Sequence, residues 1–311
     1  MMRKLKHESD LRLDRMLVDQ KFDLEVETLI EYLYSHFRKN PHDIPAFPTV
    51  ASRLIASLEQ KDVKVSEVKE LIQQDAATSA RVISASNSAL FGGVQEISSI
   101  QTAVVRLGFR ETADLAVAVA YKTLFDIEAR ARYSLFQDVW DQFYDYCLLV
   151  GYGAKFIGRE MKRGKPDILF LSGMFHDIGK LLILQAITTG VVRGKVKIEV
   201  TKHHLFELFE ELHEDIGVEF LVNNHIPEEV ILVAQDHHRL GLELTIDTLN
   251  THIVRLASAM AQKLRMFPLI EFYDYPDNFS EDSAETIQVL RLTDKKVEYL
   301  ERQFAIIADQ V

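Results

Sequence analysis

The feature that most constrains this chain is a repeat of apolar residues at helical spacing, which runs through both halves of the sequence. Within residues 10–38 the apolar positions along one helix face are Leu13, Leu17, Phe22, Val26, Leu29, Leu33 and Phe37. Glycine and proline, which most often interrupt helices, number only 13 and 7 among 311 residues, below their usual shares of about 7% and 5%. The pattern therefore predicts an all-α chain, and only residues 195–200 alternate in the manner of a strand.

The helical pattern divides the chain into four parts. At about 100–200 residues per domain, this length suggests roughly two domains. We expect an N-terminal amphipathic helix over 1–40, a first helical block over 41–126, a second over 135–266, and a loop with a C-terminal helix over 267–311. The highly charged residues 127–134 are the expected joint between the two packed blocks. The N-terminal helix either packs on its own domain or pairs with a partner, so the sequence leaves a homodimer open.

Composition and charge exclude several classes of protein. The single cysteine, Cys147, excludes an intramolecular disulfide framework. The N-terminus lacks the apolar core of a secretion signal, and no run of about 18 apolar residues could span a bilayer. Acidic residues outnumber basic ones by 47 to 36, a net charge of −11, which disfavours non-specific binding to nucleic acid or anionic membranes. We therefore expect a cytoplasmic protein with neither a nucleic-acid nor a membrane partner.

The sharpest chemical feature is the sequence His-Asp-Ile-Gly-Lys at residues 176–180, in the middle of a predicted helix from Asp167 to about Gln185. That helix is apolar on nearly every side, so we expect it to be buried. Burying a histidine, an aspartate and a lysine is costly unless each group is paired or bound. His176 and Asp177 project about 100° apart on a helix, so they can meet at one ion only where neighbouring helices supply further ligands.

Three later histidines are the candidates for those further ligands. His213 lies in the middle of a predicted helix, and His237 and His238 end the helix that Pro227 opens. Together with Asp177 they form a set of three imidazoles and one carboxylate, which suits Zn, Fe or Mn. The same residues also have an ordinary explanation, because a buried histidine is often a satisfied core residue and a histidine pair suits the C-terminal end of a helix dipole. Spacing alone leaves both explanations open.

Taken as a set, the motifs resemble the HD superfamily of helical metal-dependent phosphohydrolases, and most closely its HDOD branch, the HD-related output domains. Besides His-Asp-Ile-Gly-Lys and the His pair, the sequences that carry this resemblance are Phe47-Pro48-Thr49-Val50, Asp75 to Arg81, Asn87 to Gly92, Ile97 to Gly108, and Ile226-Pro227. They agree in order and spacing over roughly residues 40–265. The resemblance implies that the second block is an HD-like helical bundle. It also implies a bacterial signal-transduction output or scaffold domain that contacts signalling proteins.

Two positions depart from the pattern of the active HD hydrolases. The resemblance implies a metal-binding histidine on the helix before the His-Asp pair, where counting from Trp140 places Gln142, and an aspartate on a late helix, where this chain has Ser258. Neither glutamine nor serine is a strong metal ligand. The Gly-Tyr-Pro motif of cyclic di-GMP hydrolysis is also missing from the sequence. The candidate metal ligands that the chain retains are His176, Asp177, His213, His237 and His238.

We therefore expect these retained side chains to share one pocket with Gln142 and Ser258, and to hold at most one divalent metal ion. The function that follows is a non-catalytic signalling output or scaffold protein of the HDOD type. The alternative is a metal-dependent phosphohydrolase acting on a nucleotide or another phosphoester. In that case a metal-bound water would be the nucleophile, and Lys180 would neutralise a phosphate oxygen.

Two further segments are candidate contact surfaces. The loop from Phe267 to Ser283 combines acidic and aromatic side chains, which either anchor a partner protein or pack on their own domain. Residues 75–115 could mimic a helix-turn-helix motif. Residues 76–122 carry four basic against three acidic side chains, however, which makes a poor phosphate-binding face.

Overall fold

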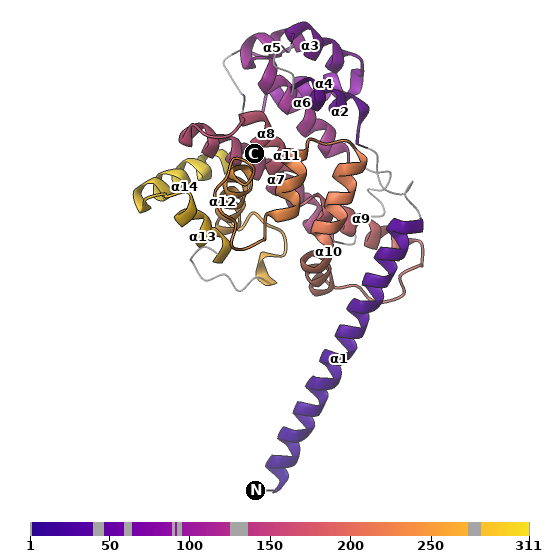
Figure 1. The fold of residues 1–311 in the computed structure, drawn as a ribbon. Coiled ribbons are helices and arrows are strands. Elements are labelled where there is room, and N and C mark those ends of the chain that lie inside the picture. The colour runs from indigo at the N-terminus through magenta and orange to yellow at the C-terminus, as the bar shows by residue number, and fades with distance from the viewer. Residues whose placement is uncertain are drawn as a thin grey trace.

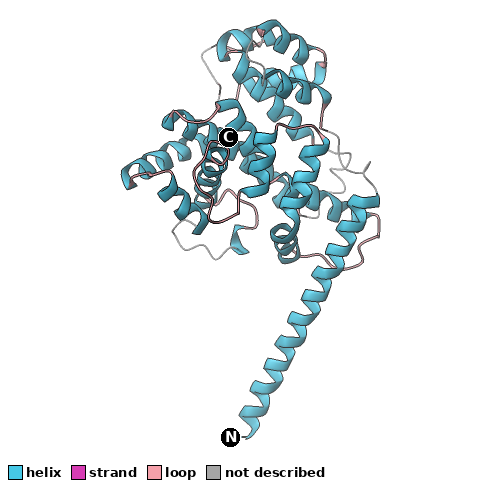
Figure 2. Cartoon of the chain, in the orientation of Figure 1, coloured by secondary structure: helices cyan, strands magenta, loops and turns pink. Residues whose placement is uncertain are grey.

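The computed structural model describes residues 2–39, 47–58, 64–88, 91, 95–124, 136–272 and 281–310. Within these ranges the regular secondary structure is helical, without a strand, which confirms the predicted fold class (Figure 2). Residues 195–200 form an irregular connection. The first helices are α1 (Met2–Lys39), α2 (Thr49–Leu58), α3 (Val65–Gln73), α4 (Ala76–Ser86), α5 (Ile100–Leu107) and α6 (Phe109–Thr123). The remaining elements are α7 (Gln137–Met161), α8 (Pro166–Phe175), α9 (Ile178–Val192), α10 (Lys202–Asn223), α11 (Glu228–Asp236), α12 (Leu249–Lys263), the 3₁₀ turn η2 (Ile270–Phe272), α13 (Glu281–Val289) and α14 (Asp294–Ala308).

The first block consists of α2 to α6 and lies at the top of Figure 1. Helix α6 contacts each of the other four helices. Polar side chains cap two of the helices. Asp75 accepts hydrogen bonds from the backbone N–H groups of Ala77 and Thr78 at the start of α4, and Ser99 accepts one from Thr102 at the start of α5. Local sequence therefore determines where these helices begin.

The second block is built around α7, which packs against α8 and α12. Glycines allow α7 and α8 to come close together. A Cβ atom on Gly173 would lie 2.6 Å from the carbonyl oxygen of Val150 and 2.7 Å from the Cα of Gly151. Helix α9 pairs with α10, and α11 lies against both α8 and α10 (Figure 1). Side chains from these four helices, which are distant in sequence, can therefore meet in one place.

The expected single helix from Asp167 to about Gln185 is in fact two helices, so this prediction was wrong. Helix α8 ends at Phe175, and α9 begins only at Ile178. Between them Asp177 leaves the helical conformation, with φ −107° and ψ 16°. The N–H of Lys180 then donates to the Asp177 carbonyl oxygen at 2.9 Å. The segments on both sides are apolar and favour helix, and no proline marks the break, so periodicity could not reveal it.

The two blocks make direct contact next to this break. The N–H of Phe47 donates to Asn224 Oδ1 at 3.0 Å. The rings of Phe47 and Tyr121, both in the first block, lie edge-on to the ring of Phe175, with centroids 5.3 and 5.2 Å away. Such aromatic pairs contribute about 0.5–1.5 kcal/mol each beyond burial. The predicted joint at residues 127–134 lies outside the described residues.

Buried charges also join the blocks. Lys155 Nζ of α7 lies 2.5 Å from Asp114 Oδ2 and 2.8 Å from Glu111 Oε2, both on α6. The side chains of Lys155 and Asp114 are only 2% and 0% exposed. Burial raises the pKa of Asp114 to about 7, against the opposing charge of Lys155. Arg110 of α6 pairs with Asp167 of α8. Removing one partner from such a cluster is costly because it leaves a buried charge unpaired.

Helix α1 lies along α9 and α10 through its C-terminal half and then extends away from the rest of the molecule (Figure 1). Leu29 and Leu33 are buried in this contact. The Tyr32 hydroxyl donates to the Ala186 carbonyl oxygen at 3.2 Å. Helix α1 therefore rests on the two helices that are joined by the connection at residues 193–201.

The C-terminal part of the chain contains two helices rather than the one predicted. Helix α14 packs against α7 and α12, where a Cβ on Gly153 would lie 2.0 Å from the ring of Phe304. The additional helix, α13, packs against α12. In the aromatic segment Phe272 is described, whereas Tyr273, Tyr275 and Phe279 lie outside the described residues. None of the described helices combines the length and apolarity that a bilayer crossing requires.

Candidate metal centre

The break between α8 and α9 places an acidic side chain at the centre of the second block. Asp177 occupies the N-cap position of α9 and is 1% exposed. Its two carboxylate oxygens face different neighbours. Oδ1 lies 3.3 Å from His237 Nε2 and 3.6 Å from His213 Nε2, whereas Oδ2 lies 3.3 Å from His176 Nε2. The carboxylate therefore has imidazoles on both sides.

A close contact between α9 and α10 brings His213 to this carboxylate. A Cβ on Gly179 would lie 1.9 Å from the His213 carbonyl oxygen and 2.9 Å from the Gly217 nitrogen, distances that no side chain tolerates. Glycine at position 179 thus allows α10 to pack directly on the first turn of α9. The glycine of His-Asp-Ile-Gly-Lys therefore helps to position a histidine more than thirty residues away.

The C-terminal end of α11 supplies the last two histidines. Arg255 of α12 donates from Nε to the His237 carbonyl oxygen at 2.6 Å and from Nη2 to the Asp236 carbonyl oxygen at 2.8 Å. Carbonyl groups at a helix end lack intrahelical partners, so the guanidinium satisfies them and holds this end in place. Arg255 is 3% exposed. Nothing in the sequence marks this residue as functional, because an arginine in an amphipathic helix normally indicates a solvent-exposed face.

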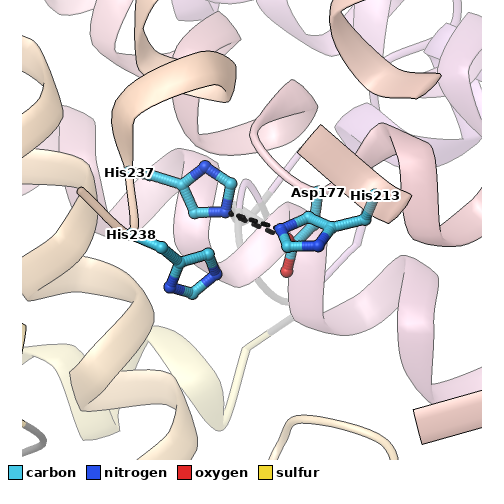
Figure 3. A group of neighbouring side chains, drawn as sticks. All are labelled: Asp177, His213, His237 and His238. Atoms are coloured by element: carbon cyan, nitrogen blue, oxygen red, sulfur yellow. Dashed lines mark hydrogen bonds and ion pairs between the residues drawn. The ribbon is translucent and has the colours of Figure 1, made fainter. Parts of the chain in front are cut away.

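Four of the predicted residues form a candidate metal-binding cluster. One ligand atom from each of Asp177, His213, His237 and His238 lies within 4.8 Å of the others. Figure 3 shows the His213 and His237 rings beside the Asp177 carboxylate. Asp177, His213 and His237 are buried, whereas His238 is exposed. The cluster therefore has one side that solvent can reach.

The hydrogen bonds of the buried histidines define which ring nitrogens can bind a cation. His213 Nδ1 donates to the Phe209 carbonyl oxygen at 2.5 Å, and His237 Nδ1 donates to that of Ala234 at 2.9 Å. Because a carbonyl oxygen only accepts, the hydrogen of each neutral ring is on Nδ1 and the lone pair is on Nε2. Backbone carbonyls commonly orient metal-binding histidines in this way.

Three electron-pair donors consequently converge without a hydrogen between them. His213 Nε2 lies 3.3 Å from His237 Nε2. Asp177 Oδ1 lies 3.3 Å from His237 Nε2 and 3.6 Å from His213 Nε2, and it is ion-paired with Lys180 Nζ at 2.9 Å. Lone pairs facing one another repel unless a cation lies among them. The residues present therefore fit a single divalent ion bound by imidazole and carboxylate.

The ionisation states of these groups suit a cation. Burial, reinforced by the nearby His238, lowers the pKa of His237 to about 3. Burial and the Lys180 charge hold the pKa of His213 well below its ordinary value. Burial by itself would raise the pKa of Asp177, but Lys180 and the histidines outweigh it and hold that pKa well below its usual range. At neutral pH the cluster therefore presents neutral imidazoles at His213 and His237 and an ionised carboxylate at Asp177.

His176 lies on the other side of the carboxylate and has different partners. Its Nδ1 donates to the Gly173 carbonyl oxygen at 2.9 Å, and its Nε2 lies 3.2 Å from the Tyr146 hydroxyl. That hydroxyl also lies 2.9 Å from Ser258 Oγ. Ser258 is thus linked to His176 through the Tyr146 hydroxyl. The expectation for Gln142 was wrong, because Gln142 is exposed. Tyr146 lies one turn further along α7, on the face that packs against α8.

Lys180 is not accessible to a ligand from solvent. The residue is 1% exposed, and its ammonium lies 2.9 Å from Asp177 Oδ1 and 3.1 Å from Asp177 Oδ2. The ring of Phe267 lies beneath it, with the centroid 4.8 Å from Nζ. The same ring is edge-on to Tyr146, at 4.9 Å between centroids. Lys180 therefore neutralises Asp177 within the protein.

Comparison with known proteins finds a curated relative. The curated relative is an uncharacterised protein of Treponema pallidum (strain Nichols), 25% identical over 240 residues. The match covers 75% of this chain and 44% of the relative, so the chain spans less than half the length of that protein.

Solved structures share the fold. An HDOD domain protein of unknown function from Geobacter sulfurreducens has a TM-score of 0.66 at 21% identity, covering 86% of this chain and 91% of its own. A candidate metal-dependent phosphohydrolase from Shewanella amazonensis SB2B has a TM-score of 0.63 at 22% identity, covering 92% and 98%. A candidate signal transduction protein from Marinobacter aquaeolei VT8 has a TM-score of 0.66 at 15% identity, covering 92% and 64%.

The family model described as HDOD domain matches residues 44–240, a range that includes the first helical block, the second block as far as α11, and all five retained histidine and aspartate residues. The sequence motifs, the helical fold and the cluster around Asp177 are thus explained together: the chain belongs to the HDOD domain family.

Proposed function

We propose that this protein is a non-catalytic signalling output or scaffold protein that contacts other signalling proteins and holds one divalent metal ion in its second block. The observation that carries the proposal is the cluster in which Asp177, His213 and His237 direct three electron-pair donors at one point. His238 lies at the exposed side of the same point. Zn, Fe or Mn fits this ligand set.

Signalling is supported by membership of the HDOD family, since HDOD denotes HD-related output domains. A structural neighbour from Marinobacter aquaeolei VT8 is named as a candidate signal transduction protein. At 15% identity, that similarity shows a shared fold only. The signalling partners of the whole protein are part of our proposal.

The absence of catalysis is supported by the contacts of Lys180, the candidate catalytic group, and of His176, a candidate metal ligand. A bound ion supplies Lewis-acid chemistry and lowers the pKa of a coordinated water. Hydrolysis of a phosphoester also needs a group that neutralises the phosphate. Lys180 is buried and paired with Asp177, so it does not face a substrate. His176 is hydrogen-bonded to Tyr146. Both side chains therefore make contacts within the protein and do not face a substrate.

A metal-dependent phosphohydrolase remains the second candidate function. The observation in its favour is the exposed His238, which would let a substrate from solvent approach an ion held by the cluster. A structural neighbour from Shewanella amazonensis SB2B is named as a candidate enzyme of this kind. Both functions include a bound ion, but only the phosphohydrolase would convert a substrate.

Elemental analysis of the purified protein, followed by turnover assays, tests the proposal. We expect about one divalent ion per chain, and little ion in His213→Ala. His225→Asn is the matched control, because His225 is an exposed histidine just after the end of α10, the helix that carries His213, and asparagine tolerates its positive φ of 54°. A chain without bound metal would contradict the metal centre. Chelator-sensitive hydrolysis of nucleotide phosphoesters would instead favour the enzyme.

A further inference from the structure

The Asp177 carboxylate is arranged as it would be between two ions. One oxygen faces His213 and His237, and the other lies 3.3 Å from His176 Nε2. A carboxylate with imidazoles at both oxygens can bridge two ions a few ångströms apart, which is the arrangement of two-metal sites. The question is therefore what prevents an ion from binding on the His176 side.

The lone pair of His176 on that side already has a partner. Its Nδ1 is committed to the Gly173 carbonyl oxygen, so in the neutral ring Nε2 can only accept. The Tyr146 hydroxyl, 3.2 Å away, must therefore donate to it. Ser258 Oγ lies 2.9 Å from the same hydroxyl and donates to it, because the hydroxyl's own hydrogen points to His176.

The ring of Tyr146 also occupies the space. Tyr146 is 0% exposed. Its ring lies edge-on to Phe267 at 4.9 Å and tilted against His176 at 5.8 Å between centroids. An ion bound by His176 and Asp177 Oδ2 would have to displace the phenol from a packed and hydrogen-bonded position.

We propose that Tyr146 limits this centre to one ion, because its hydroxyl takes the lone pair with which His176 would bind a second ion and its ring fills the adjoining space. The inference rests on the proposed metal centre. It makes Tyr146 a residue that determines metal stoichiometry, and therefore whether one-metal or two-metal chemistry is open to this chain.

The test replaces the tyrosine by a ligand and compares it with a matched change outside the pocket. The test variant is Tyr146→His with Ser258→Asp. The control is Gln142→His with Ser258→Asp, which adds the same two ligand types but places the histidine on an exposed position. Each protein is equilibrated with Zn²⁺ at a fixed free concentration and its metal content is measured. We expect one ion in the native protein and the control, and two in the test variant.

A second readout does not depend on the double variant folding. In protein with ¹⁵N-labelled histidine, one equivalent of Zn²⁺ should shift the ring nitrogens of His213 and His237 and leave those of His176 unchanged. Tyr146→Phe, which removes only the hydroxyl, should shift His176 Nε2 in the metal-free protein and leave His213 unchanged.

The outcomes separate the two proposals. Two ions in the native protein, a His176 shift on binding the first ion, or a second ion in the Gln142→His control would each overturn the role of Tyr146. Binding of no ion by the native protein would overturn the metal centre and, with it, the stoichiometric role. In that case an altered His176 signal in Tyr146→Phe would show that the hydrogen bond itself had been identified correctly.

Discussion

Gly179→Ala tests how the packing of two helices controls the metal centre. The added Cβ would lie 1.9 Å from the His213 carbonyl oxygen, and the atoms nearby are backbone, which cannot rotate away. Reaching even 3.0 Å requires α9 and α10 to separate by about 1.1 Å. Overpacking of this kind costs about 3 kcal/mol. Alanine's higher helix propensity offsets about 1 kcal/mol of that. We therefore expect a net loss of about 2 kcal/mol in the free energy of unfolding.

The same displacement should weaken metal binding, because Asp177 moves with α9 and His213 with α10. Ligand distances in metal sites hold within about 0.2 Å, so a shift several times larger should lower Zn²⁺ affinity by at least about 100-fold. The affinity is measured by competition with a chromophoric chelator, and stability by urea unfolding of the metal-free protein.

Gly190→Ala is the matched control for this prediction. It lies on the same helix, and its Cβ would meet the Tyr32 hydroxyl at 2.5 Å and a Val196 methyl at 2.8 Å, both side-chain atoms that can move. We expect little change in its Zn²⁺ affinity. Native affinity in a folded Gly179→Ala protein would refute the idea that this contact positions His213, and an equal loss in Gly190→Ala would point to a general effect on α9.

Three further predictions concern the metal, pH and buried charge. A strong chelator should lower the melting temperature of the native protein but not that of His213→Ala, since an ion at 100 times its Kd stabilises by about 2.7 kcal/mol; equal shifts would contradict a specific site. In metal-free protein the free energy of unfolding should fall as pH drops from about 6.5 towards 3, because His237, with a folded pKa of about 3, stays neutral while its unfolded counterpart takes up a proton. The free energy of unfolding should change by at most about 1.4 kcal/mol per pH unit through this group. Urea unfolding that gives the same free energy at pH 7 and pH 5 would contradict a neutral, buried His237. Lys155→Met should cost about 3 kcal/mol by stranding Asp114, whereas Arg159→Met, at a side chain 57% exposed, should cost less than about 1 kcal/mol; similar losses by urea unfolding would argue against a buried cluster.

Much of the fold follows from local chemistry that the sequence displays. Apolar spacing marks the helices, Pro166 and Pro227 stand at the starts of α8 and α11, and Asp75 caps α4. These signals act within a few residues of where they occur, so they survive in any tertiary context. The motif order also identified the family, because each motif can be matched one by one without knowing where it lies in space.

The residues of the candidate metal centre could be predicted from the sequence for the same reason. Asp177, His213, His237 and His238 are residue types that bind metals, and the order in which they occur matched the resemblance. Their chemistry is a property of the side chains themselves. Only their convergence within 4.8 Å needed the packed helices.

What the tertiary structure decided is which neighbours each of these side chains has. The break at Asp177 lies between two apolar helical segments, and its carboxylate faces side chains on α9, α10 and α11 that local periodicity cannot identify as its neighbours. Tyr146 rather than Gln142 faces His176 because the packing of α7 on α8, through contacts such as Gly173 with Gly151, sets which turn of α7 lies at that depth. A sequence specifies the face of a helix by its period, but the position along the partner helix depends on contacts between distant residues, and these form only in the folded chain.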